Sequence, residues 1–279
     1  MARAGWLAAP ATRRTVRPAH RPAALVAATA TGLALTIAVV GCTPGAAQDA
    51  APGTGPAGVT TDGFPSARTA PASAAADRIG TLFVGGPDGA RSCTASVVSS
   101  PGRSLLVTAA HCVESRFFGR AGQLEFAPGY RNGRLPHGSW LVERMTVPTA
   151  WSEEADPEYD VAFLTVGELD GRRIEEVLGG FPLGTDRGFG LPVTVTGYPM
   201  AAEEPITCAN TTAEQSPTQE RFDCHGYTDG TSGSPWLTEA GEVVGVVGGH
   251  EEGGDTERTS YSITFDRRVA ELYRQAVTG

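Results

Sequence analysis

Three short motifs of this 279-residue chain carry side chains that can act together in nucleophilic catalysis. His111 follows an apolar run and two alanines, Asp160 opens a second apolar run, and Ser232 lies in a turn flanked by glycines. A serine hydroxyl is a weak nucleophile at neutral pH and needs a base within hydrogen-bond reach. A histidine supplies that base, and a buried carboxylate fixes the imidazole in the tautomer that accepts the serine proton. Together the three residue types predict a Ser-His-Asp site.

The turn around Ser232 also predicts a place for a developing oxyanion. Gly230 stands two residues before the serine, and a glycine lets the backbone turn so that the N–H groups of Gly230 and Ser232 point the same way. Donors that are already in place stabilise the negative charge of a tetrahedral intermediate. Asp156 is the nearest rival for the carboxylate, but it precedes a proline in a polar loop. Asp160 is followed directly by apolar residues that would bury it, so Asp160 is preferred.

Short runs of β-branched residues, broken by glycine, proline and aspartate, must position these motifs. They predict strands at 80–84, 93–98, 105–108, 141–147, 161–166, 193–198, 222–226, 243–247 and 259–264. Many short strands with turn residues between them are typical of an antiparallel sandwich or barrel. Residues 266–277 alone show apolar side chains at helical spacing, which predicts one C-terminal helix that closes the domain. The sequence therefore predicts an all-β domain.

The N-terminal part of the chain predicts export. Five arginines precede an uncharged apolar stretch at 23–40, the arrangement of a signal peptide, although the stretch is also long enough for an uncleaved anchor. Val39–Cys42 resembles a bacterial lipobox, which predicts a lipoprotein-type signal over 1–41 and lipidation of Cys42. Residues 42–76, rich in alanine, proline and glycine, predict a flexible linker, and 77–279 the folded domain. We therefore expect an exported chain that is tethered to the outer face of the membrane by lipid, or secreted.

Charge and cysteine usage narrow the class of partner. All 22 basic residues are arginine, and five of them precede residue 42, so the rest of the chain carries 17 arginines against 31 acidic residues. An acidic body of this kind disfavours nucleic acid as a partner. No CxxC pair or convincing metal-ligand cluster occurs, so we expect neither a metal nor another cofactor. A monomer is the simplest expectation.

The motifs TAAHC at 108–112, DVAFL at 160–164 and GTSGSP at 230–235 resemble, in this order, the chymotrypsin-fold serine proteases. The likeness is greatest to the bacterial branch that includes V8-like glutamyl endopeptidases. It implies two antiparallel six-stranded barrels with the catalytic cleft between them. It makes Ser232 the nucleophile, His111 the general base and acid, and Asp160 the orienting carboxylate, with Gly230 and Ser232 forming the oxyanion hole.

The resemblance also implies a Cys93–Cys112 disulfide, and Cys208 and Cys224 most simply bridge the hairpin before the Ser232 loop. Four cysteines allow three pairings, and counting alone does not choose among them.

Departures from the family pattern bear on activation and specificity. Thr231 stands where the digestive enzymes have an aspartate that binds a freed N-terminus, so Arg78–Gly80 is not expected to be a processing site. Gly226, followed by Tyr227, stands where a trypsin-like pocket would have its aspartate, so a preference for arginine or lysine is not expected.

Two further groups of residues are candidates for substrate binding. His225 and His250 are candidates for the histidine that Glu-specific relatives place near the pocket. Gly248 and Gly249, with His250, are predicted to form the edge that pairs with the substrate backbone.

Taken together, the motifs predict an extracellular serine endopeptidase that cleaves peptide bonds in peptide or protein substrates through an acyl-enzyme. Two alternatives stay open. One is a protease-like binding module of the cell envelope that keeps the three residues but turns nothing over. The other is an esterase acting on small acyl groups, which would use the same nucleophile and differ only in substrate.

Overall fold

The computed structural model describes residues 60, 63–114 and 122–279. The predicted signal peptide, its lipobox and Cys42 lie outside the described residues. Within them, no helix is both long and apolar enough to cross a membrane.

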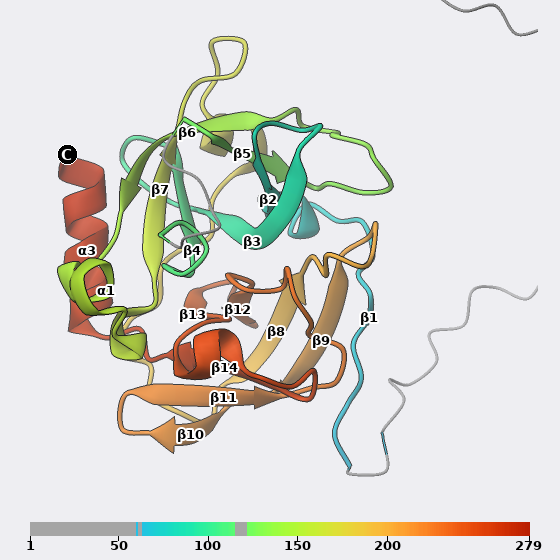
Figure 1. Ribbon diagram of the computed structural model, residues 1–279, viewed down its shortest axis with the longest axis vertical. Helices are drawn as coiled ribbons and strands as arrows, with labels where there is room; N and C mark the ends of the chain where they lie inside the picture. Colours follow the sequence, from blue (N-terminus) through green and yellow to red (C-terminus); the bar gives the residue numbers. More distant parts are fainter. Residues whose placement is uncertain (1–59, 61–62, 115–121) are drawn as a thin grey trace, which may run out of the picture. The chain divides into compact units, whose positions relative to one another are not determined.

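The first half of the domain is a closed antiparallel barrel of six strands (Figure 1). Its order is β2-β3-β4-β7-β6-β5, so the last strand pairs again with the first. The strands are β2 (Ile79–Val84), β3 (Ala90–Val98), β4 (Leu105–Thr108), β5 (Leu124–Pro128), β6 (Trp140–Thr146) and β7 (Ala162–Val166). Alternate side chains fill the interior, where Leu82, Phe126 and Leu164 are fully buried. The barrel confirms the predicted β class for this half.

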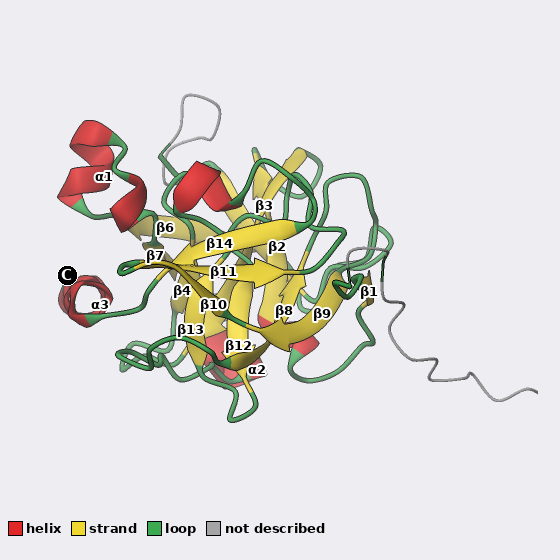
Figure 2. Ribbon diagram, turned by 90° about the horizontal axis from the view of Figure 1, so that it is seen from below, coloured by secondary structure: helices red, strands yellow, loops and turns green. Residues whose placement is uncertain are grey.

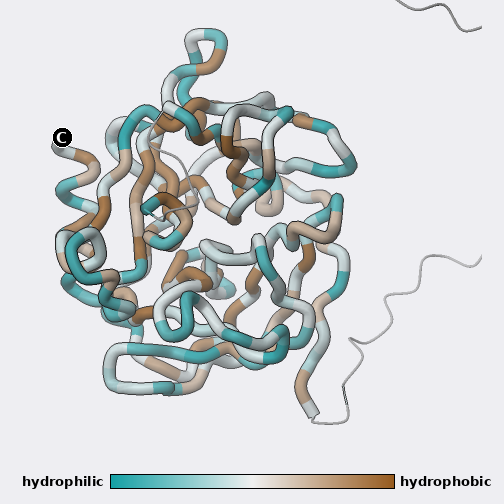
Figure 3. Tube along the Cα trace, viewed as in Figure 1, coloured by the Kyte–Doolittle hydropathy of each residue, from teal (hydrophilic) through white to brown (hydrophobic). Residues whose placement is uncertain are grey.

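The second half contains two sheets in place of a second closed barrel. The first sheet has the order β1-β9-β8-β12-β13, and the second has the order β10-β11-β14. Their strands are β1 (Arg68–Thr69), β8 (Pro192–Gly197), β9 (Ile206–Thr211), β10 (Ala213–Ser216), β11 (Gln219–Asp223), β12 (Pro235–Thr238), β13 (Val243–Val246) and β14 (Thr259–Ile263). The β10–β11 hairpin is mostly hydrophilic, as Figure 3 shows.

β13 and β14 approach each other without forming a ladder, so the two sheets stay separate there. The Val246 amide donates to the Ser262 hydroxyl at 3.0 Å, and the Gly248 amide donates to the Tyr261 carbonyl at 2.9 Å. A side chain thus stands where continuous backbone pairing would join the two sheets. The prediction of two closed six-stranded barrels is confirmed for the first half only.

Three helices lie outside the sheets in the described part of the chain. They are α1 (Thr149–Glu154), α2 (Ile174–Leu178) and α3 (Arg267–Thr278), with short 3₁₀ turns η1 (Ala76–Arg78), η2 (Pro157–Tyr159) and η3 (His250–Gly253). α3 lies beside β6 and β7 in both views (Figures 1 and 2). Its buried face joins the core that the two halves share, and the Asp266 carboxylate accepts a hydrogen bond from the Arg268 amide at its start. The predicted C-terminal helix is therefore confirmed.

Residues 65–70, which precede the predicted domain, take part in the fold. β1 pairs antiparallel with β9, and the bridge between Ser66 and His225 continues this contact in parallel. The Ala67 amide donates to the His225 carbonyl, and the His225 amide donates to the Pro65 carbonyl. The composition of this segment predicts a linker because it offers little apolar surface, but here backbone hydrogen bonds hold it, and these do not depend on side-chain type.

Replacing Glu220 with glutamine is expected to remove a loss of stability that the wild-type protein shows as pH rises. The Glu220 side chain is 2% exposed, and its Oε2 atom has no hydrogen-bond partner among the described residues. Burial raises the pKa of this carboxyl to about 7, although a hydrogen bond with Thr212 opposes the shift. Between the ordinary pKa of glutamate and about 7, the folded state holds a proton that the unfolded state has released, so the free energy of unfolding falls as pH rises. Above pH 7 it should be about 3 kcal/mol lower than below the ordinary pKa.

Urea unfolding of both proteins at pH 5, 6, 7 and 8 measures this difference. Glu214→Gln is the matched control, because Glu214 faces Glu220 across the β10–β11 pair and is exposed. A Glu220→Gln protein with the same pH slope as wild type would contradict the assignment.

Candidate active site

A cavity of about 680 Å³ brings together residues from both halves of the domain. His111 borders it from the turn that follows β4, and the segment 227–232 borders it from the loop before β12. Val247 and the segment 251–257 form a further wall. The turn after β4, the loop before β12 and the segment 251–257 therefore line one cavity.

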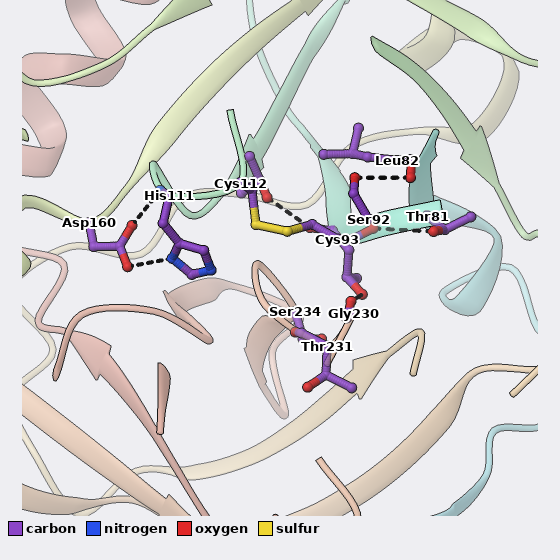
Figure 4. The surroundings of a disulfide bond; sticks show 12 residues. Thr81, Leu82, Ser92, Cys93, His111, Cys112, Asp160, Gly230, Thr231 and Ser234 are labelled. Carbon is purple, nitrogen blue, oxygen red and sulfur yellow. Dashed lines mark hydrogen bonds and ion pairs between the residues drawn. A yellow bond between two sulfur atoms is a disulfide. The ribbon is translucent and has the colours of Figure 1, made fainter. Parts of the chain in front are cut away.

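His111 and Asp160 form a buried, hydrogen-bonded pair (Figure 4). The His111 Nδ1 atom lies 2.7 Å from Asp160 Oδ2, and the His111 backbone amide donates to Asp160 Oδ1 at 2.9 Å. The Gly249 amide donates to Oδ2 at 2.8 Å. Asp160 is fully buried and His111 is 7% exposed. Three donors therefore hold the carboxylate, and the carboxylate fixes the imidazole.

The local sequence explains how this pair forms. After β4 the chain turns tightly, with the Cys112 amide donating to the Ala109 carbonyl. The Cys93–Cys112 disulfide ties this turn to β3, with 6.0 Å between the two Cα atoms (Figure 4). A Cβ at Gly248 would lie 3.0 Å from Asp160 Oδ2, so a glycine there lets the next amide reach the carboxylate.

The charge of Asp160 governs the protonation of His111. Burial alone would lower the pKa of the His111 imidazole, because the charged form loses solvation. The negative charge of Asp160 and its hydrogen bond outweigh burial, and the charge of Glu252 adds to them. The pKa of His111 is therefore raised above its ordinary value.

The loop of Ser232 is held through its carbonyl groups. The Thr94 amide donates to the Ser232 carbonyl at 2.8 Å, and the Thr94 hydroxyl donates to the Gly230 carbonyl at 2.9 Å. Gly230 has φ +94°, and a Cβ there would lie 2.6 Å from the Tyr198 carbonyl oxygen, so only glycine fits. Within the described part of the chain, the amides of Gly230 and Ser232 donate to no protein acceptor.

Two serines of the GTSGSP motif have different surroundings. Ser234 is fully buried, and its hydroxyl donates to the Thr231 carbonyl. Ser232 is partly exposed and borders the same cavity as His111. No hydrogen bond joins Ser232 to His111 among the residues described. Of these two serines, only Ser232 borders the cavity.

The predicted substrate-binding residues divide into two groups. Tyr227 borders the cavity and donates its hydroxyl to the Val195 carbonyl at 2.8 Å. Gly226, Gly248, Gly249 and His250 do not border it. The Gly226 amide is bound to the Glu257 carbonyl, and the Gly249 amide is bound to Asp160.

The candidate histidines for a Glu-specific pocket also lie elsewhere. His225 Nε2 lies 3.1 Å from the Thr60 hydroxyl, and neither His225 nor His250 borders the cavity. His250 packs edge-on against the Tyr261 ring and lies 3.4 Å from Glu251.

Asp156, the rival carboxylate, accepts a hydrogen bond from the Glu158 amide and caps η2. It makes no contact with His111 among the described residues. The second implied disulfide, Cys208–Cys224, is present.

Several residues of the site give no clear sign in the sequence. Thr94 lies in the middle of β3, and nothing local indicates that it binds the Ser232 loop. The acidic run EEGGDTE at 251–257 is visible, but its composition does not tell which cleft it borders.

The described residues contain one group that could in principle hold a metal ion, namely Cys93, His111 and Cys112. Both of its sulfur atoms are in the disulfide, and a metal ligand would have to be a thiolate.

Comparisons with known proteins find peptidases. A protein from Bacillus subtilis (strain 168), described as an extracellular metalloprotease, is 25% identical over 185 residues, which cover 62% of this chain and 55% of that protein. The chain thus spans little more than half the length of this curated relative.

Two solved structures share the fold. The protease Anisep from Arthrobacter nicotinovorans superposes with a TM-score of 0.64 and 26% identity, over 73% of this chain and 96% of that one. A Glu endopeptidase gives the same TM-score at 17% identity, over 77% and 98% of the two chains, and this likeness concerns the fold alone.

The family model for the trypsin-like peptidase domain matches residues 93–246. The matched region begins at Cys93, the disulfide partner of Cys112, and it includes His111, Asp160 and Ser232. It supports a serine peptidase, and the bacterial proteases above support a peptidase. Because the match covers more than half of the sequence, the chain belongs to the trypsin-like peptidase family.

Proposed function

We propose that this chain is an extracellular serine endopeptidase that hydrolyses peptide bonds through an acyl-enzyme. The observation that carries the proposal is the buried His111–Asp160 pair, which borders the same cavity as Ser232. A nucleophile, a base and a group that orients the base are the parts that acyl transfer needs.

In the first half of the reaction, Ser232 Oγ attacks the carbonyl carbon of the substrate and its proton passes to His111 Nε2. The negative charge forms on the carbonyl oxygen, where the amides of Gly230 and Ser232 can donate to it. The C–N bond then breaks, and the His111 proton passes to the departing amine. This leaves an ester between Ser232 and the acyl part of the substrate.

In the second half, water attacks the ester and gives its proton to His111. The bond to Ser232 breaks, the serine oxygen takes the proton back, and a carboxylic acid product leaves. Asp160 stays ionised throughout and stabilises the imidazolium that forms twice.

A fluorophosphonate probe tests the proposal. It should add once to the wild-type protein, and peptide mapping should place the adduct on Ser232. Ser232→Ala should not react. Equal labelling of both proteins, or an adduct elsewhere, would contradict the role of Ser232.

One observation favours a second candidate, the unproductive binding module. No hydrogen bond joins Ser232 to His111 among the residues described. In an active enzyme this bond would have to form when the substrate binds, whereas in a binding module it would not form. A protein with intact disulfides that reacts with no probe and cleaves no peptide, yet binds an envelope component, would favour this candidate.

The acid limb of the pH–rate profile should depend on Glu252. His111 must be neutral to accept the serine proton, so activity falls as pH drops through its raised pKa. Glu252→Gln removes a negative charge that raises this pKa, and the acid limb should move to lower pH. The measurement is kcat/KM against pH, with Glu239→Gln, an exposed carboxylate outside the cavity, as control. An unmoved limb in Glu252→Gln would show that this charge does not reach His111.

We also propose that Cys42 carries a lipid that keeps the exported protein on the membrane. Two disulfides and the extracellular relative support export. Cys42→Ala should release the protein into the medium, as measured by immunoblotting of cells and medium. Unchanged retention would point to an uncleaved helix instead.

A further inference from the structure

Five carboxylates border the cavity that contains His111 and Ser232. They are Asp229, Glu251, Glu252, Asp255 and Glu257, which we call the acidic rim. All five are exposed, and His111 is the one basic residue that borders the same cavity among the described residues. The space in which a substrate would lie is therefore strongly negative.

The charges of the rim are largely free to bind a substrate. Glu251 lies 3.4 Å from His250. No arginine or histidine of the described residues forms an ion pair with the other four carboxylates. A cationic side chain entering the cavity would thus meet four carboxylates that have no ion-pair partner in the described part of the chain.

The acidic rim borders the same cavity as His111, the base of the proposed reaction. The His111 side chain is more than nine-tenths buried and borders the cavity, and its Nε2 atom has no partner among the described residues. The charge of Glu252 raises the pKa of His111, so the rim and the imidazole lie within electrostatic reach of each other.

Backbone hydrogen bonds fix the rim to the wall that carries Ser232. The amides of Gly226 and Tyr227 both donate to the Glu257 carbonyl, at 2.8 and 3.4 Å. The Gly254 amide donates to the Glu251 carbonyl at 3.0 Å. The rim therefore has a defined place beside the loop that carries Ser232.

We propose that the acidic rim selects polypeptides that carry arginine or lysine close to the scissile bond. This inference rests on the proposed function and names its substrate class. The position six residues before Ser232 is glycine and predicts no such preference, but the segment 251–257 supplies the charge from another part of the chain. A glutamate beside the scissile bond would be repelled by the same carboxylates.

The size of the preference follows from the exposure of the rim. Each exposed pair of opposite charges gives roughly a twofold to fivefold preference, and salt screens it. Several carboxylates acting on one cation should give about a tenfold preference at low salt. The preference should shrink toward 1 in 0.5 M NaCl, where the Debye length is below about 8 Å.

The experiment compares quenched peptides that differ in one side chain near the cleaved bond, with arginine, its neutral isostere citrulline, or glutamate. The full exported protein is used, and kcat/KM is measured at low and high salt. We expect the arginine peptide to be cleaved about tenfold faster than the citrulline peptide at low salt, and the glutamate peptide to be the slowest.

Two fourfold variants separate the rim from overall charge. The rim variant is Glu251→Gln, Glu252→Gln, Asp255→Asn and Glu257→Gln, and its ratio of arginine to citrulline cleavage should fall to near 1. The control carries Glu153→Gln, Glu154→Gln, Glu214→Gln and Glu239→Gln, all exposed and outside the cavity, and should keep the wild-type ratio. Circular dichroism checks that both fold.

Three outcomes would overturn the inference. Equal cleavage of arginine and citrulline peptides by a wild-type protein that reacts with fluorophosphonate at Ser232 would remove the rim from specificity while leaving the proposed function intact. A rim variant with the wild-type ratio would do the same. A wild-type protein that reacts with no probe and cleaves no peptide would instead overturn the proposed function, and this inference with it.

Discussion

Replacing Ser232 with alanine is expected to lower kcat by about 10⁶, because removal of the nucleophile ends covalent catalysis. The residual rate over water should come from the donors of Gly230 and Ser232 and from substrate binding. Stability should change little, since the Ser232 hydroxyl makes no hydrogen bond among the described residues and is partly exposed. The measurement is steady-state hydrolysis of an activated peptide ester, with unfolding followed in parallel.

Ser234→Ala is the matched control in the same motif. Its hydroxyl is buried and donates to the Thr231 carbonyl, so its loss should cost on the order of 1 kcal/mol of stability and less than about tenfold in rate. If Ser234→Ala were as inactive as Ser232→Ala, or Ser232→Ala kept its activity, the nucleophile would be misassigned.

Replacing Asp160 with asparagine should lower kcat by about 10⁴. The carboxylate accepts from three donors, and an amide has only one oxygen with which to accept. If the amide nitrogen faces His111 Nδ1, the imidazole must carry its proton on Nε2 and can no longer take the proton of Ser232. The opposite orientation leaves the buried His111 amide without an acceptor.

Asp156→Asn makes the same change at the other carboxylate that the sequence offers. Asp156 caps η2, and asparagine caps a helix about as well as aspartate, so the substitution should cost less than about fivefold in kcat and little stability. A loss of activity in Asp156→Asn that matches the loss in Asp160→Asn would mean that the effect is structural. Steady-state kinetics and near-ultraviolet circular dichroism measure both variants.

The strands that the sequence predicted best are those with continuous apolar runs. The run at 105–108 coincides with β4, and 259–264 agrees with β14 to one residue. β1, β5, β9, β10 and β12 were not predicted. Of these, Ile206–Thr211 is half polar, and Ala213–Ser216 is mostly polar and at least partly exposed throughout. Such strands form because a neighbour supplies hydrogen bonds, and a single sequence does not reveal that neighbour.

The candidate site likewise contains residues whose positions the sequence predicted and residues whose positions it did not. His111 and Asp160 come together as predicted, since each lies beside an apolar strand of one barrel and β4 pairs with β7. The wall at 251–257 was not predicted to border the cavity, because loops of polar residues and glycine carry no periodicity from which a position in space follows. Specificity is therefore the part of the function that the sequence conceals most.

The pairing of β1 with β9 has a practical consequence for anyone producing this protein. A recombinant chain that begins at residue 77 would leave β9 as an uncovered outer strand, with its amides and carbonyls free to recruit another molecule. Such a preparation should self-associate when it is concentrated. A chain that begins at residue 58 would keep β1 paired with β9 and should not self-associate in this way.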